Sequence, residues 1–230
     1  MTRKHIGCNV TTCPQPACRL SGECVNRTLF MASPPLAPTD ASRTIIAFTG
    51  LAGAGKSTAA AHLVKLRGFE RVRFAGPLKA MMAALGCTAA EIDGDRKETP
   101  CDLLGGKTPR WAMQTLGTEW GRQLIGPDLW IRAWRAAVDR LPAGTPVVVD
   151  DCRFPNEAEA IRSAGGVVVR LERPGAGTAS THESEQHHLD AIHVLHNTLD
   201  EQNLREQVDV FLRDLSWVDR SLPRITSPGA

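Results

Sequence analysis

The sequence predicts an α/β fold of three layers (α/β/α), in which helices cover both faces of a central, mainly parallel β-sheet. Short apolar runs rich in β-branched residues alternate along the chain with amphipathic stretches of helical period, as in successive βαβ units. One of these runs leads through a glycine-rich loop directly into an alanine-rich stretch of helical type. The chain has 230 residues, of which 42% are hydrophobic, and this suffices for one such domain with a full core plus appendages.

Residues 1–42 differ in composition from the rest, and we expect them to form an appendage on a flexible linker. The chain has seven cysteines, and in a reducing compartment free thiols or a metal site are more common than disulfides. Four thiols would complete a closed structural zinc site, although the spacings are not those of common zinc ribbons. The cluster is therefore either a zinc site or a tail of reduced cysteines. Its members are Cys8, Cys13, Cys18 and Cys24.

The first predicted strand runs into the clearest motif of the chain. Residues 44–58 read TIIAFTGLAGAGKST and match G-x-x-x-x-G-K-[ST] in full. Glycines in such a loop let successive N–H groups surround phosphate oxygens, Lys56 supplies a cation for the β- and γ-phosphates, and the Ser57 hydroxyl is a magnesium ligand. We therefore expect ATP to bind here, at the start of a helix that ends near Gly68. The expected nucleotide contacts are Gly50, Gly53, Ala54, Gly55, Lys56, Ser57 and Thr58.

The next stretch predicts a short strand over Glu70–Phe74 and a helix that Pro77 opens. Lys79 lies in the first turn of this helix. It is either a solvated lysine or a contact for the phosphate of a second substrate. Residues 88–109 are polar and rich in turn residues, which predicts a surface excursion rather than core.

A clear amphipathic helix is predicted from Pro109, over PRWAMQTLGTEWGRQL. At about 100° per residue its apolar side chains form one arc, which consists of Ala112, Met113, Leu116, Trp120 and Leu124. Polar residues at spacings of four form a stripe elsewhere on the helix, which consists of Arg110, Gln114, Thr118 and Arg122. Gly117 and Gly121 flank this stripe, and because glycine weakens helices we expect a group to pack close to the backbone there. The stripe is either a solvated face or, as we favour, a surface for an anionic, hydrogen-bonding ligand.

The stretch that follows predicts a helix over Asp128–Leu141, and Trp130 at its start either packs in the core or stacks on a base. The run Pro146–Asp151 then predicts a buried parallel strand that ends in two carboxylates. Beside a phosphate-binding loop, such a strand delivers an aspartate that holds magnesium or orients the nucleophile. Asp150 and Asp151 compete for this role.

The remaining residues complete the alternation of strands and helices. They predict a helix opened by Pro155 and stopped at Gly165, a strand over Gly166–Glu172, a loop over Arg173–Glu185 that can close over a nucleotide, a strand over Ile192–His196, and a closing helix marked by Leu204, Val208 and Phe211. We expect the folded domain to span residues 43–218 and residues 219–230 to form a disordered tail.

Net charge and hydropathy indicate which classes of binding partner to expect. The net charge is +2, with both signs spread along the chain, so we do not expect a dedicated nucleic-acid surface. No apolar stretch approaches the roughly 18 to 20 residues that a membrane span needs, and the N-terminus lacks a signal-peptide core. We therefore predict a cytoplasmic protein without a membrane partner.

In seven colinear blocks, over roughly residues 44–200, the chain resembles phage-type deoxynucleoside monophosphate kinases. The blocks are GLAGAGKST, FAGPLK, KTPRWAMQTLGTEWGR, GPDLW, VVVDDCRFPNEAEAI, GGVVVRLERPG and HESE. The patterns PRxxxQxLGTExGR and DDxRFPNE are far more specific than the loop motif. The resemblance implies an NMP-kinase-like P-loop NTPase fold, with a helical substrate-binding and lid region over about residues 88–141. The chain departs from the family in its N-terminal appendage and at Cys152, where the family tends to carry an aliphatic residue.

The resemblance implies a phosphotransferase with a phosphate group as acceptor, which uses ATP and Mg²⁺ to convert deoxynucleoside 5′-monophosphates to diphosphates and so supplies phage DNA synthesis. The implied catalytic residues are Lys56, Asp151 and Arg153, with Ser57 and Asp151 as magnesium ligands and Lys79, Arg110, Gln114 and Arg122 at the monophosphate. From the patterns above we add Thr118 and Trp130 to the substrate site and Arg173 to the nucleotide site. The sequence leaves the oligomeric state open, with a homodimer as one candidate.

Two alternatives remain open at this point. One is another P-loop kinase, acting on phosphomevalonate, dephospho-coenzyme A or a hydroxymethylated base within DNA. The other is a P-loop ATPase or nucleotide switch with the cysteine tail as a binding module. A switch should lack the second set of arginines and should hydrolyse its nucleotide without an acceptor.

Overall fold

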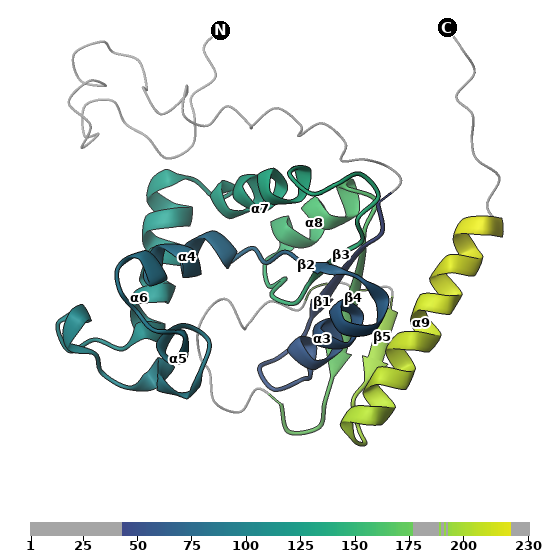
Figure 1. The fold of residues 1–230 in the computed structure, drawn as a ribbon, viewed down its shortest axis with the longest axis horizontal. Coiled ribbons are helices and arrows are strands. Elements are labelled where there is room, and N and C mark those ends of the chain that lie inside the picture. Colours follow the sequence, from purple (N-terminus) through teal and green to yellow (C-terminus); the bar gives the residue numbers. More distant parts are fainter. Residues whose placement is uncertain (1–42, 177–188, 190, 192, 222–230) are drawn as a thin grey trace, which may run out of the picture. The chain divides into compact units, whose positions relative to one another are not determined.

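The structure is a computed structural model that describes residues 43–176, 189, 191 and 193–221, with side chains described as far as residue 215. The cysteine cluster of the appendage, most of the loop over Arg173–Glu185 and residues 222–230 lie outside the described residues. Within the described part, a five-stranded sheet is flanked by helices on both faces (Figure 1). Among the described helices, none combines the length and the apolar composition that a bilayer crossing needs.

The sheet has the strand order β2-β3-β1-β4-β5, and every neighbouring pair of strands is parallel. Its strands are β1 (Ile45–Thr49), β2 (Glu70–Arg71), β3 (Val147–Val149), β4 (Val167–Glu172) and β5 (His193–His196). In the centre, Ile45 of β1 lies opposite Val147 of β3. Because β1 and β3 are parallel neighbours, the glycine loop after β1 and the aspartates after β3 emerge at the same edge of the sheet.

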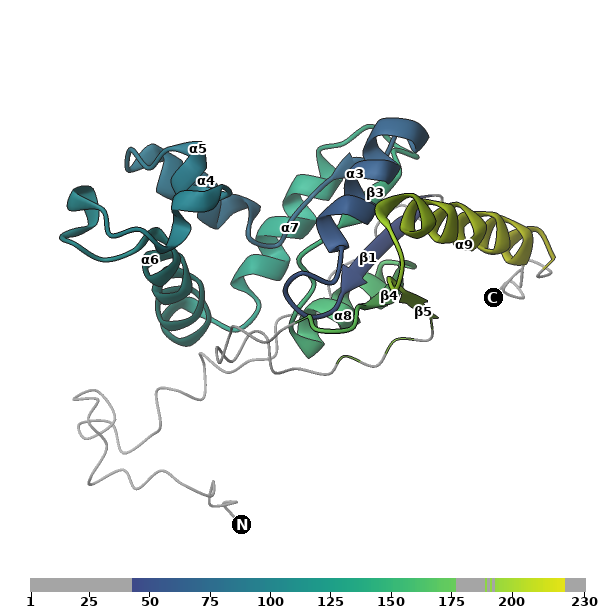
Figure 2. The same cartoon turned by 90° about the horizontal axis from the view of Figure 1, so that it is seen from below.

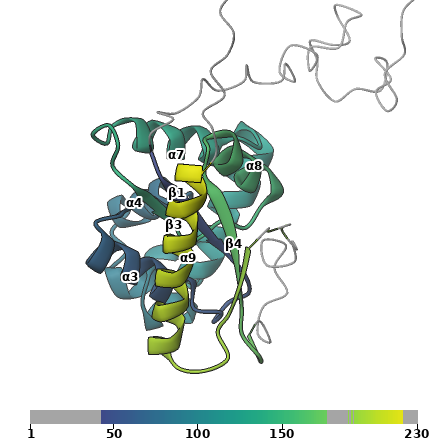
Figure 3. The same ribbon diagram turned by 90° about the vertical axis from the view of Figure 1, so that its right-hand side faces the viewer.

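Helices α3 (Lys56–Arg67) and α9 (Glu201–Ser221) cover one face of the sheet, and α7 (Leu129–Asp139) and α8 (Pro155–Ser163) cover the other (Figure 3). Side chains of β1 alternate between the two cores with the period of a strand: Ile45 and Ala47 pack with α7 and α8, whereas Ile46 and Phe48 pack with α3 and α9. The predicted three-layer α/β/α class is confirmed.

The predicted ends of the elements hold to within a few residues. Gly68 ends α3 in the left-handed conformation, with φ 69°, and prolines open α4 (Gly76–Ala84), α6 (Pro109–Thr115) and α8. The strand β2 is shorter than predicted, although the N–H of Val72 still donates to the Val148 carbonyl at 3.0 Å. Helix α9 continues to Ser221, three residues past the predicted end of the domain at 218.

The helical lobe, residues 76–125, lies to one side of the sheet (Figure 2). Besides α4 and α6 it contains α5 (Ala89–Ile92), the 3₁₀ turns η1 (Asp95–Glu98) and η2 (Asp102–Leu104), and η3 (Leu116–Ile125). The expectation that residues 88–109 form a surface excursion rather than core holds for most of the stretch, which is exposed, but not for the turn at Glu91 and Ile92. Ile92 is buried in a small separate core with Met82 and Cys87, and a capping box between Thr88 and Glu91 starts α5.

The apolar arc predicted for the helix from Pro109 is wrong in its second half. Trp120 is 38% exposed and Leu124 is 77% exposed. The reason is that η3 is a π-helix, in which the N–H of each residue bonds five positions back, as the 3.0 Å bond from Gly126 to the Gly121 carbonyl shows. The wider turn rotates each later side chain away from the position that an α-helical period assigns to it.

Candidate active site

The glycine loop between β1 and α3 adopts a backbone that only glycine accepts easily. Gly50, Gly53 and Gly55 have φ values of 132°, 81° and 103°. A Cβ on Gly50 would lie 2.3 Å from the Leu171 carbonyl oxygen, and a Cβ on Gly55 would lie 2.8 Å from Leu204. The loop therefore packs closely against β4 at Gly50 and against α9 at Gly55.

The opposite side of the loop fits phosphate. A Cβ on Gly53 would meet nothing within 4 Å, so this part of the loop faces open space. Helix α3 begins directly at Lys56, without an acidic side chain in its first turn, so its positive end can receive an anion. The Lys56 ammonium donates to the carbonyl oxygens of Gly50 at 2.6 Å and Leu51 at 2.8 Å, which holds this cation over the loop.

Asn197 supports the glycine loop, and the sequence analysis did not predict this role. It follows β5, is buried, and donates through Nδ2 to the Ala54 carbonyl at 3.1 Å. A Cβ on Gly55 would lie 2.7 Å from the same Nδ2 atom. The main-chain N–H of Asn197 donates to the Glu172 carbonyl at 2.7 Å. One residue thus ties the glycine loop to the ends of β4 and β5.

Asp150 follows β3 and belongs to the glycine-loop side of the site. It accepts hydrogen bonds from Arg73 at 2.8 and 3.3 Å, and Arg71 lies 3.9 Å away. Burial, the largest single contribution, acts to raise the pKa of Asp150. The hydrogen bond and charge of Arg73, the charge of Arg71 and a hydrogen bond with Ser57 outweigh it, so the pKa is lowered and the carboxylate stays ionised.

Asp151, the next residue, has a different environment. Its two oxygens accept the main-chain N–H groups of Phe74 at 3.0 Å and Ala75 at 2.9 Å. Burial is the main cause that raises the pKa of Asp151, and the neighbouring charge of Asp150 adds to it. The two adjacent carboxylates therefore differ: Asp150 pairs with cations beside Ser57, whereas Asp151 fixes the chain after β2 and lines a cavity.

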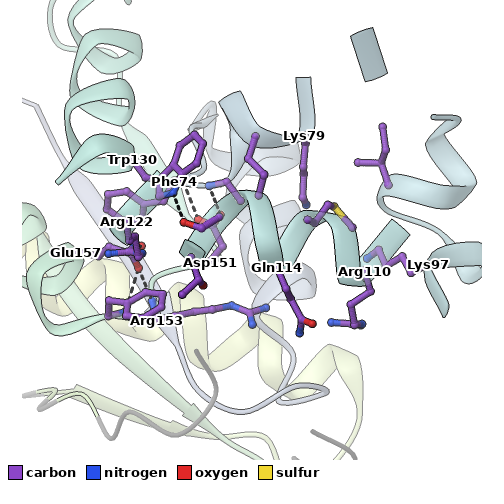
Figure 4. Close-up of a pocket in the computed structure, with 17 residues that line it drawn as sticks. Phe74, Lys79, Lys97, Arg110, Gln114, Arg122, Trp130, Asp151, Arg153 and Glu157 are labelled. Carbon is purple, nitrogen blue, oxygen red and sulfur yellow. Dashed lines mark hydrogen bonds and ion pairs between the residues drawn. The ribbon is translucent and has the colours of Figure 1, made fainter. Parts of the chain in front are cut away.

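That cavity, of about 200 Å³, lies between the helical lobe and the ends of β2 and β3 (Figure 4). It brings together all six predicted substrate residues and two of the three predicted catalytic residues. These are Lys79, Arg110, Gln114, Thr118, Arg122 and Trp130, with Asp151 and Arg153. The other polar and aromatic lining residues are Phe74, Lys97, Phe154 and Glu157. The third predicted catalytic residue, Lys56, belongs to the glycine loop and does not line this cavity.

The outer part of the cavity is rich in positive charge. Lys79 pairs with Asp93 at 2.6 Å and Arg110 pairs with Glu98. Burial lowers the pKa of Lys97, and the positive charges of Lys79 and Arg110 add to this effect. A lysine whose charged form is disfavoured by neighbouring cations marks a place where an anion would be stabilised.

Arg122 is held at the inner end of the cavity by several neighbours, among them the Pro127 carbonyl, to which it donates at 3.2 Å, and the Asn156 amide oxygen at 3.4 Å. Its guanidinium lies 3.7 Å from the centre of the Phe154 ring and pairs with the buried carboxylate of Glu157. Glu157 also accepts the main-chain N–H groups of Arg153 at 2.8 Å and Phe154 at 3.1 Å. Burial raises the pKa of Glu157 to about 7, although the charge of Arg122 acts in the opposite direction.

Trp130 is 6% exposed, and its indole N–H donates to the Gly117 carbonyl at 2.8 Å. A Cβ on Gly121 would lie 2.6 Å from the indole ring. The expectation that a group packs close to the backbone is confirmed at Gly121, where the group is Trp130, whereas a Cβ on Gly117 would meet only Leu78 at an ordinary 3.8 Å. Trp130 lines the cavity while it is packed in this way, and stacking of a base on it stays a prediction.

Other predicted residues lie apart from this cavity. Thr58 is in the first turn of α3, and Arg173 is exposed directly after β4, near the edge of the sheet where the glycine loop emerges. Cys152 is buried in the core with α7 and α8, where it acts as the small apolar residue expected there. In the described part of the chain, no group of three or more His, Cys, Asp or Glu side chains is arranged to hold a metal ion.

Five residues of the candidate site were not assigned from the sequence: Phe74, Lys97, Phe154, Glu157 and Asn197. Phe154 and Glu157 lie within the RFPNE part of a block that carries the family resemblance, so a signal for them was present. Lys97 lies in a polar stretch that resembles any solvated loop. Asn197 had no local signal, because its role depends on the contact of β5 with a loop far away in the sequence.

Comparison with known proteins gives one relative of clear similarity. A protein of Acanthamoeba polyphaga mimivirus described as "Putative deoxynucleotide monophosphate kinase" is 36% identical over 154 residues, which cover 61% of this chain and 80% of the relative. No protein-family model matches the chain. Among solved structures, TT1252 from Thermus thermophilus has 19% identity and a TM-score of 0.43, with 75% of this chain and 98% of that chain covered. A sugar kinase from Janibacter sp. HTCC2649 has 16% identity and a TM-score of 0.35, with 78% and 95% covered.

Proposed function

The chain belongs to the deoxynucleotide monophosphate kinase family, and on this basis we propose that it transfers the γ-phosphoryl group of ATP to the 5′-phosphate of a deoxynucleoside monophosphate. The observation that carries the proposal is the cavity that joins the polar stripe of the lobe to Asp151 and Arg153. A second anion site near the glycine loop is what a kinase with a phosphate acceptor needs. A role in phage DNA synthesis remains a prediction from the resemblance.

In this proposal the residues of the cavity bind and orient the acceptor. A monophosphate is already an anion at neutral pH, so its attacking oxygen needs no general base, and the work of the site is neutralisation and alignment. Lys79, Arg122 and Arg153 supply positive charge to the acceptor phosphate from three different elements. Gln114 can read a base edge, because its amide offers both a donor and an acceptor.

The glycine loop is proposed to bind the phosphates of ATP, with main-chain N–H groups on its open side and with Lys56. Magnesium, when bound, would neutralise charge on the phosphates. For its ligands, the oxygen donors Ser57 and Asp150 fit better than Asp151. The pKa of Asp150 is lowered and its carboxylate makes a hydrogen bond with Ser57, whereas burial raises the pKa of Asp151. Arg73, which donates to both oxygens of Asp150, would share this carboxylate with the ion. Magnesium binding through Asp151 was the prediction from the family pattern, and we now favour Asp150.

The direct test is to incubate the protein with ATP, Mg²⁺ and each of the four deoxynucleoside monophosphates separately, and to measure the diphosphates by chromatography. We expect one or more of the four to be converted at a rate that depends on its concentration. ATP hydrolysis without conversion of any acceptor would contradict the proposal and support the switch or ATPase. Conversion of phosphomevalonate, dephospho-coenzyme A or hydroxymethylated DNA alone would identify a different P-loop kinase.

A further inference from the structure

Four side chains at spacings of four line one cavity over three helical turns. They are the stripe residues Arg110, Gln114, Thr118 and Arg122, and Figure 4 shows Arg110 and Arg122 towards opposite ends of the cavity with Gln114 between them. An unbroken α-helix would not produce this arrangement. In an α-helix a step of four residues exceeds one turn by about 40°, so three steps would rotate Arg122 by about 120° from Arg110.

The change of helix type removes this rotation. The first step, from Arg110 to Gln114, lies in α6, where the side chain advances past a full turn. The last step, from Thr118 to Arg122, lies in η3, where hydrogen bonds span five residues and a turn is wider than four residues. A step of four residues in η3 falls short of a full turn. The side chain of Arg122 is therefore rotated about the helix axis in the direction opposite to the rotation between Arg110 and Gln114. Arg122 consequently stays on the cavity side.

Trp130 is placed to hold the wide turn. Its indole N–H donates to the carbonyl of Gly117, and its ring occupies the space that a side chain at position 121 would need. Gly121 is buried by this contact, whereas a Cβ on Gly117 would meet only a Leu78 methyl group at an ordinary 3.8 Å. The two glycines therefore differ: close packing requires glycine at 121 but not at 117.

We propose that Gly121 and Trp130 are positioning residues, which hold the π-helical turn that directs Arg122 to the acceptor phosphate. The inference rests on the proposed function, because it assigns a consequence for the monophosphate. It predicts that disturbing this contact weakens binding of the monophosphate without affecting ATP, since the glycine loop contacts neither residue.

The experiment is steady-state kinetics with both substrates varied, for the wild type, Gly121→Ala, Glu119→Ala as the control on the same helix, Trp130→Phe, and the double variant Gly121→Ala with Trp130→Phe. We expect Gly121→Ala to raise KM for the monophosphate about tenfold or more, as for loss of a charged hydrogen bond, with KM for ATP within about twofold. Glu119→Ala should stay within about threefold of wild type for both substrates, because Glu119 is exposed in η3 and does not line the cavity. The double variant should recover part of the loss, because phenylalanine leaves room for the added methyl group.

The outcomes separate this inference from the proposed function. If the wild type converts none of the four monophosphates, the proposed function is wrong whatever the variants do. If the wild type is active and Gly121→Ala leaves KM for the monophosphate unchanged, the positioning role is wrong. The role is also wrong if Gly121→Ala raises both KM values equally, because a general loss of fold would explain that result.

Discussion

Among single residues, Lys56 and Lys65 form a matched pair on α3. Lys56 lies over the glycine loop, whereas Lys65 is exposed in the last turn of the same helix. Lys56→Ala should lower kcat by about a hundredfold or more, because it removes a cation that would meet charge developing on the transferred group. Lys65→Ala should leave kcat unchanged. Turnover and circular dichroism of both variants test this, and an active, folded Lys56→Ala protein would refute the assignment of the loop.

The two aspartates after β3 give a second residue-level prediction. Asp150→Asn should raise the magnesium concentration needed for half-maximal activity, since it weakens an ionised oxygen ligand beside Ser57. Asp151→Asn should instead disturb the chain at Phe74 and Ala75, which lines the acceptor cavity, and should raise KM for the monophosphate. Magnesium titrations and substrate kinetics of both variants distinguish these effects. A magnesium defect confined to Asp151→Asn would restore the assignment that the family pattern implies.

Glu157 makes stability depend on pH in a predictable direction. Its pKa in the folded protein is about 7, above the ordinary value of 4.5, so the folded state binds this proton more tightly than the unfolded state does. The stabilisation is complete below pH 4.5 and is lost as the pH rises towards and through 7. Relative to Glu157→Gln, the wild type should therefore lose on the order of 1–3 kcal/mol of unfolding free energy between pH 5 and pH 8.

Urea unfolding of the wild type and Glu157→Gln at several pH values measures this difference. Glu159→Gln is the matched control, because Glu159 is exposed on the same helix and should show no such trend. A difference between wild type and Glu157→Gln that stays constant from pH 5 to pH 8 would show that Glu157 is ionised throughout, held by Arg122.

At the level of elements, the junction of β5 and α9 supports the nucleotide site through Asn197. Asn197→Ala removes the donor to the Ala54 carbonyl, a buried group that would then have lost one partner. We expect KM for ATP to rise about tenfold, with KM for the monophosphate changed much less. The matched control is Asn203→Ala on α9, because the Asn203 side chain accepts a hydrogen bond from Gln207 within the same helix. Equal effects on both substrates would mean that Asn197 acts only on general stability.

The elements also show what the sequence could predict. The apolar β-branched runs, the prolines at helix starts and the glycines at helix ends located nearly every strand and helix, because each of these signals is local. The helix from Pro109 was located correctly, but its second half was given the wrong buried face. Hydrophobic periodicity assumes one period throughout, whereas η3 depends on a contact with Trp130 from another helix.

The candidate site likewise has features that the sequence predicted and features that it could not predict. The polar stripe, Asp151 and Arg153 were predicted from sequence and lie in one cavity. The different roles of Asp150 and Asp151 could not be predicted. Both follow β3, and their partners, Arg73 for Asp150 and the main chain after β2 for Asp151, are distant in the sequence.

At the level of the whole molecule, Arg43, the first described residue, joins the start of β1 to the end of α7. Its guanidinium donates to the Val138, Leu141 and Pro142 carbonyls and so caps the end of α7. A truncated protein that starts at Arg43 should be folded and active, whereas one that starts at Thr44 should be less stable by about 2 kcal/mol or more. Thermal unfolding and kinase assays of the two truncations test this. Equal stability would show that the cap contributes nothing.

Metal analysis of the full chain beside the truncation that starts at Arg43 tests the cysteine cluster. About one zinc per full chain, absent from the truncation, would support a structural zinc site at Cys8, Cys13, Cys18 and Cys24. No zinc in either protein would support a tail of reduced cysteines. Activity should be the same in both proteins, because the described site lies entirely after residue 42.

The central position of β1 has a consequence for biosynthesis. This fully buried strand, IIAFT, pairs only with β3 and β4, both of which come much later in the chain. Arg43, just before β1, can donate to the Val138 carbonyl only after a further 95 residues have been synthesised. At ribosomal rates, on the order of 5–20 residues per second, this interval leaves the emerging apolar segment without its partners for roughly 5–20 s. We therefore expect the yield of folded protein in a cell to depend on chaperones that shield residues 45–49 until the later strands leave the ribosome.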